Sequence, residues 1–97
     1  MKAIVNVVGR DRLGIIAEVS GVLYQKRVNI LDLSQTIMED YFTMVMLVDL
    51  GQMEGSFKSL KESLRACSEK IGMSIRIQEE SIFKAMHQVN FGGETLD

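Results

Sequence analysis

Residues 7–15 are Val7-Val8-Gly9-Arg10-Asp11-Arg12-Leu13-Gly14-Ile15, and they join an apolar run typical of a β-strand to a run with helical spacing. The short loop between the two runs concentrates glycine, arginine and aspartate. A helix N-terminus offers unpaired N–H groups and a favourable dipole to an anion, so this loop is a candidate binding site. A purely structural interpretation stays open, in which Asp11 caps the helix and Gly9 makes the turn.

Hydrophobic periodicity on both sides of this loop predicts a complete small fold. We expect strands over residues 2–8, 30–38, 42–50 and 73–78, and helices over residues 14–27 and 57–71. Asn29 stands where a left-handed residue would end the first helix, and Gly72 where one would end the second. The order β-α-β-β-α-β predicts an α+β, ferredoxin-like fold: a four-stranded antiparallel sheet with both helices on one face.

Residues 79–97 are not needed to complete this unit. Ile82, Phe83, Met86 and Val89 have helical spacing, and residues 90–97 have the composition of a loose tail. We therefore divide the chain into a domain at 1–78 and a C-terminal extension at 79–97, a short helix followed by a flexible tail. The sheet face away from the helices carries Ile4, Val8, Val45 and Leu47, so we expect the extension to cover this face of its own sheet or of a partner's.

Composition narrows the function classes. The formal charge of the 97 residues is -2, which removes the general attraction to phosphate backbones that nucleic-acid binders use. The single cysteine, Cys67, and the single histidine, His87, cannot form a disulfide or complete a metal shell, so we expect neither metal nor cofactor. No apolar run approaches the roughly 18 residues that span a bilayer. These features favour a cytoplasmic protein without membrane partners.

The loop at residues 7–15, together with Val28-Asn29-Ile30 at the start of the next strand, resembles the ACT domain family. The resemblance covers residues 2 to about 78 and is closest to free-standing bacterial members related to the glycine-cleavage transcriptional repressor. One departure is Leu13, because the family usually has proline there. Without this proline, the backbone φ at the start of the helix is not fixed in advance by a ring.

The resemblance implies a non-catalytic regulatory homodimer that binds an amino acid and contacts a further protein. In the family the ligand lies between this loop of one subunit and an adjacent region of a second. Carried over, the ligand-binding positions are Gly9, Asp11, Arg12, Gly14 and Ile15 in the loop, with Asn29 and Ile30 beside them. From the residues alone, Asn29 can instead be a helix C-cap and Arg12 a solvated charge.

Two other functions share this order of elements. Small acyl-phosphate hydrolases use a loop arginine and an asparagine, which Arg10 or Arg12 with Asn29 could imitate, but no nucleophile or carboxylate dyad accompanies them. RNA-binding domains of this architecture stack bases on aromatic side chains of the open sheet face. Here that face is predicted to carry Ile4, Asn6, Val8, Thr43, Val45 and Leu47. The regulatory module is therefore preferred.

Overall fold

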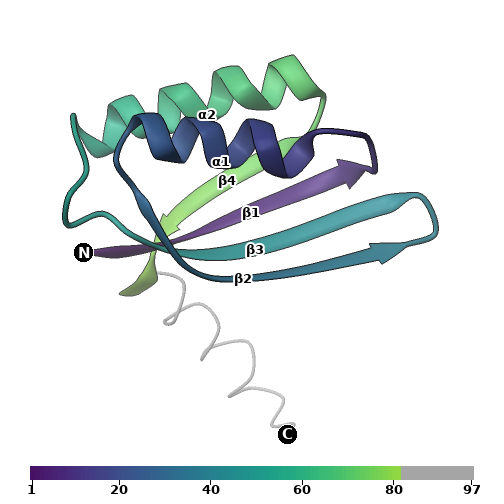
Figure 1. Cartoon of the computed structure of the whole chain (residues 1–97), viewed down its shortest axis with the longest axis horizontal. Coiled ribbons are helices and arrows are strands. Elements are labelled where there is room, and N and C mark those ends of the chain that lie inside the picture. The colour runs from purple at the N-terminus through teal and green to yellow at the C-terminus, as the bar shows by residue number, and fades with distance from the viewer. Residues whose placement is uncertain (82–97) are drawn as a thin grey trace, which may run out of the picture.

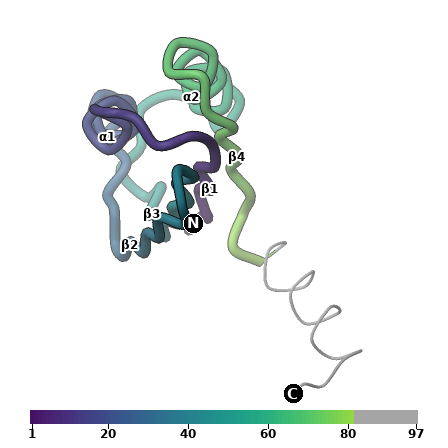
Figure 2. Tube along the Cα trace, turned by 90° about the vertical axis from the view of Figure 1, so that its right-hand side faces the viewer, coloured from purple at the N-terminus to yellow at the C-terminus, as the bar shows by residue number. Residues whose placement is uncertain are grey.

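The computed structural model describes residues 1–81, so the predicted C-terminal helix, the tail and His87 lie outside the described part. The elements are β1 (Lys2–Arg10), α1 (Ile15–Gln25), β2 (Asn29–Met38), β3 (Tyr41–Asp49), α2 (Phe57–Ile71) and β4 (Ser74–Glu79). All pairs in the sheet are antiparallel, and the strand order is β2-β3-β1-β4. Both helices lie on one face of the sheet, as Figures 1 and 2 show. The predicted ferredoxin-like α+β fold is confirmed.

The core fills the space between the sheet and the two helices. On β1, Ala3, Val5 and Val7 are buried beneath the helices, as their alternation predicts. The remaining core side chains come from both helices, from β3 and from the connections: Ile15, Val19, Leu23, Val28, Phe42, Met44, Met46, Val48, Leu50, Leu60, Leu64, Cys67, Ile71 and Met73. Within residues 1–81, no helix is long and apolar enough to cross a membrane.

Strand β2 forms one edge of the sheet and departs from simple alternation. Its register against β3 shifts between Ile30 and Asp32, which places Leu31 in a β-bulge. Leu33 and Ile37 lie opposite Met46 and Phe42, on the helix side of the sheet, yet they are 38% and 54% exposed. Strand β2 therefore carries apolar side chains that the rest of the described part, residues 1–81, leaves uncovered.

The ends of α2 are set by local capping residues, whereas the end of α1 is set by tertiary packing. Helix α2 begins at Ser56, whose Oγ accepts from the Ser59 N–H at 3.0 Å, and ends at Gly72 in the left-handed conformation, as predicted. The prediction for α1 is wrong, because the left-handed residue after this helix is Arg27 (φ 59°). Asn29 is already the first residue of β2. The chain turns early because Val28, which is 6% exposed, enters the core.

Candidate functional site

The loop between β1 and α1 is shorter than the sequence suggests and ends at Gly14. This glycine is the N-cap of α1 with φ 90° and ψ 5°, and no side chain of residues 1–81 caps the helix. The first intrahelical bond runs from the Glu18 N–H to the Gly14 carbonyl at 3.0 Å. The interpretation of Asp11 as the helix cap is therefore wrong. The N–H groups of the first helical turn point toward the loop without an intrahelical acceptor.

The start of the loop is braced by the β2–β3 hairpin. The Asp11 N–H donates to the Asp40 carbonyl at 2.8 Å. The Asp40 carboxylate pairs with the Arg10 guanidinium, which also lies 5.6 Å from the ring centre of Tyr41. Because the Arg10–Asp40 pair is exposed, it contributes little stability by itself. The ion pair instead holds the end of β1 next to the hairpin turn at residues 39–40.

Arg12 braces the other side of the loop. Its Nη1 donates to the Ile71 carbonyl at 3.2 Å, at the C-terminal end of α2. A cation is favourable there because the last carbonyls of a helix carry partial negative charge. The bond is partly buried and joins residues 59 positions apart in the chain. Arg12 therefore has a hydrogen-bond partner within the protein, although the residue as a whole is exposed.

An open hollow of about 430 Å³ lies over the loop and the start of α1. Residues 11–17 line it, together with Gln35 of β2 and Phe42 of β3. Asp11 supplies a carboxylate, Gln35 an amide, and Phe42 an apolar wall. Sequence reasoning missed Gln35, because its place beside the loop depends on how β2 pairs with β3. The hollow has the size range of small-molecule sites.

Gly9 does not have the turn-forming role that the structural interpretation gave it. It lies within β1, opposite Phe42, and its φ is not positive, so it does not make the turn. A Cβ at this position would lie 2.7 Å from the Met73 sulfur and 3.4 Å from the Met73 Cα. Gly9 therefore allows close packing of the Met73 side chain, in the residue before β4, and it does not line the hollow.

Asn29 and Ile30 do not lie beside the loop within one chain. They begin β2, just beyond the C-terminal end of α1, whereas the loop precedes its N-terminal end. The 11 residues of α1 separate the two ends by about 16 Å at the usual helical rise. Asn29 instead lines a second hollow with residues such as Tyr24 and Gln52. A single chain thus brings together only part of the predicted site.

The positions of these residues argue against the two alternative functions, the acyl-phosphate hydrolase and the RNA-binding domain. Arg10 is held by Asp40 and Arg12 by Ile71, and Asn29 is at the other end of α1, so they form no arginine–asparagine pair. The open sheet face carries Ile4, Val45 and Leu47 where an RNA-binding sheet would carry aromatic side chains. Among residues 1–81, no three acidic, histidine or cysteine side chains are placed to hold a metal ion.

Fold and loop together define a small α+β domain with a ligand-sized hollow at a strand–helix junction. The family model of the ACT domain matches residues 2–78, and the chain belongs to the ACT domain family. This membership supports a regulatory, ligand-binding module.

Similar proteins span almost the whole chain. A UPF0237 protein from Clostridium acetobutylicum is 52% identical over 89 residues, covering 92% of this chain and 100% of the relative. The solved structure of an ACT domain protein from Streptococcus pneumoniae is 40% identical with a TM-score of 0.75, covering 86% of this chain and 93% of that one. A structure assigned to a glycine cleavage system transcriptional repressor has a TM-score of 0.67 at 24% identity, covering 79% of this chain and 44% of that one, and shares the fold.

Proposed function

We propose that this protein is a non-catalytic regulatory homodimer that binds an amino acid in the hollow at the β1–α1 loop. The observation that carries the proposal is the uncapped N-terminus of α1 opening into this hollow beside Asp11. The ligand carboxylate accepts from the N–H groups after Gly14, where the helix dipole favours negative charge. The ligand ammonium group meets the Asp11 carboxylate. A zwitterion matches both ends of the hollow.

The second subunit is supported by the exposed apolar side chains around β2 and α1. They include Leu31, Leu33 and Ile37 on the edge strand, with Ile16 and Tyr24 on the helix. An uncovered apolar edge strand invites pairing with another chain. Pairing of β2 with β2 of a second copy satisfies the free backbone groups of this edge and covers the apolar side chains around it.

Antiparallel pairing of the two β2 strands also completes the site. Strand β2 runs from Asn29, near the C-terminal end of α1, to Met38 at the hairpin that contacts the loop. A two-fold axis therefore carries the Asn29 end of one copy toward the loop end of the other. In this arrangement Asp11 and Gly14 come from one subunit and Asn29 and Ile30 from the second, where the Asn29 amide both donates to and accepts from the ligand.

Isothermal titration with the twenty common amino acids tests the ligand. At least one amino acid should bind. Asp11→Asn should weaken this binding by about tenfold, because the ligand ammonium group then faces a neutral amide instead of the Asp11 carboxylate. Glu69→Gln is the matched control, since Glu69 is exposed on α2 and away from the hollow. Flat heats for all twenty at millimolar concentration would refute the amino-acid assignment.

A subunit-mixing experiment tests whether the site is shared. Asp11→Asn and Asn29→Ala should each bind poorly alone. Random exchange of subunits between them should restore about a quarter of the sites, because each mixed dimer has one intact pair. Unchanged binding by Asn29→Ala would contradict a shared site.

Light scattering tests the dimer itself. It should report a dimer for the parent and a monomer for Leu33→Lys, with Val8→Lys on the open face as the control.

A further inference from the structure

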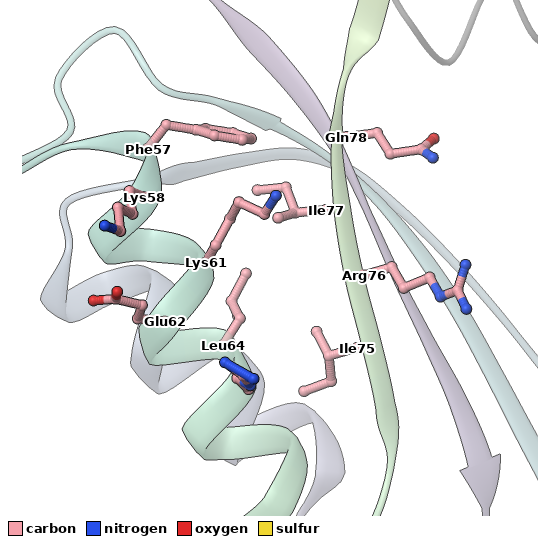
Figure 3. Close-up of a pocket in the computed structure, with 10 residues that line it drawn as sticks. Phe57, Lys58, Lys61, Glu62, Leu64, Ile75, Arg76, Ile77 and Gln78 are labelled. Atoms are coloured by element: carbon pink, nitrogen blue, oxygen red, sulfur yellow. The ribbon is translucent and has the colours of Figure 1, made fainter.

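A further groove, larger than the β1–α1 hollow, lies between α2 and β4. Its volume is about 720 Å³, and its apolar floor is formed by Leu64, Ile75 and Ile77 with Phe57 at one end. Figure 3 shows Ile75 and Ile77 pointing from β4 toward α2, while Arg76 and Gln78 point away from the helix. The groove is well separated from the β1–α1 hollow, since the two share no lining residue.

The rim of this groove is basic, although the chain as a whole carries a formal charge of -2. Lys58, Lys61 and Arg65 line it from α2, with Glu62 as the single acidic lining residue. Within residues 1–81, the ion pairs involve other residues, so none of these three cations forms an ion pair with a carboxylate of the described part. Lys61 reaches over the groove and lies 5.9 Å from the ring centre of Phe57.

The floor of the groove is also the edge of the sheet. Among residues 1–81, β4 pairs with β1 alone, so alternate N–H and C=O groups along its outer side have no strand partner in this part of the chain. A strand added here would send alternate side chains to two different surroundings. One set would lie over Ile75 and Ile77 beneath Lys61, and the other would lie beside Arg76 on the open face.

We propose that this groove binds an extended acidic segment of a partner protein, added to the sheet as a strand beside β4. Main-chain hydrogen bonds to β4 supply affinity. The side chains of the segment that face α2 include apolar ones, which pack on the groove floor, and an acidic one, which pairs with Lys61 or Arg65. Carboxylates of the other set pair with Arg76 on the open face. The combination of an open strand edge, an apolar floor and unpaired cations distinguishes this site from a simple anion site.

Charge also argues against a second copy of this chain as the occupant. Two such grooves facing each other would bring together the lysines and arginines of both, a like-charge arrangement that costs free energy. The exposed apolar residues around β2 and α1 lie at the opposite edge of the sheet order, so the proposed dimer leaves β4 available.

The proposal is tested by fluorescence anisotropy with the fluorescein-labelled heptapeptide Glu-Val-Glu-Glu-Glu-Val-Glu, whose second, fourth and sixth side chains face α2 and so offer two valines to the floor and one glutamate to Lys61. We expect saturable binding that weakens with salt, because exposed charge pairs are screened. Lys61→Glu should weaken binding by about fivefold or more, the effect of roughly 1 kcal/mol. Lys2→Glu changes the net charge equally, lies on β1 outside the groove, and should leave the affinity nearly unchanged.

Two peptide controls separate strand addition from general attraction. The same peptide with lysine for glutamate should not bind. A glutamate peptide with every backbone amide methylated keeps its charge but has no N–H donor on either edge, so it cannot pair as a strand and should bind much more weakly. Equal binding of the methylated peptide, or amide NMR shifts that map to β2 instead of β4, would overturn the proposal. Loss of amino-acid binding at the other hollow would leave it unaffected.

Discussion

Replacement of Gly14 by alanine isolates the backbone geometry at the start of α1. Gly14 has φ 90°, and a Cβ added there would meet nothing within 4 Å, so alanine introduces strain without a clash. A left-handed conformation costs an L-residue roughly 1–2 kcal/mol, and part of this is offset because alanine also restricts the unfolded chain by about 0.4–1 kcal/mol. We expect Gly14→Ala to lower the free energy of unfolding by about 1 kcal/mol.

Gly21 provides a matched control within the same helix. A Cβ there also meets nothing within 4 Å, but Gly21 lies in the middle of α1 and its φ is not positive. Gly21→Ala should therefore stabilise the protein by about 0.5–1 kcal/mol through helix propensity. The two substitutions add the same methyl group and should have opposite effects.

Thermal unfolding followed by far-UV circular dichroism measures both. For a domain of this size 1 kcal/mol shifts Tm by about 4–8 °C, so Gly14→Ala should unfold at a lower temperature and Gly21→Ala at a higher one. Gly14→Asn should lose less than Gly14→Ala, because asparagine tolerates positive φ. If Gly14→Ala were as stable as the parent, the left-handed N-cap and the loop built on it would be wrong.

The remaining predictions concern α2 and its neighbours. Arg12→Ala should lower the free energy of unfolding by about 1 kcal/mol, because the Ile71 carbonyl loses its donor; an unchanged urea midpoint would count against this brace. Ser56→Ala should cost about 1 kcal/mol in the same assay, and Ser56→Asp, which can still cap the helix, should retain most of the stability. Burial, and secondarily the charge of Glu18, raise the pKa of the Cys67 thiol, whereas Lys70 opposes them. Cys67 should react with a disulfide reagent only as the protein unfolds, and rapid labelling of the native state would contradict its burial. Because the folded thiol keeps its proton to higher pH than the unfolded thiol, stability should fall as the pH rises above the unfolded pKa, and Cys67→Ala should lack this contribution.

The parts of the fold that depend on local periodicity were predictable. The alternation of Val5 and Val7, the stripe of Leu60 and Leu64, and the stop at Gly72 all follow from the spacing of side chains along one element. The charged and glycine-rich character of the β1–α1 loop could also be read directly from its residues. These features need no knowledge of what lies across the sheet.

The sequence by itself determined the order of elements, the buried faces and the residues of the loop, because hydrophobic spacing and glycine conformations are properties of short stretches. Only the tertiary structure decided that Gly9 packs on Met73, that Arg12 reaches Ile71 and that Gln35 borders the hollow. Each of these contacts joins residues far apart in the chain. They depend on strand register and helix placement, which many side chains set together and no local pattern contains.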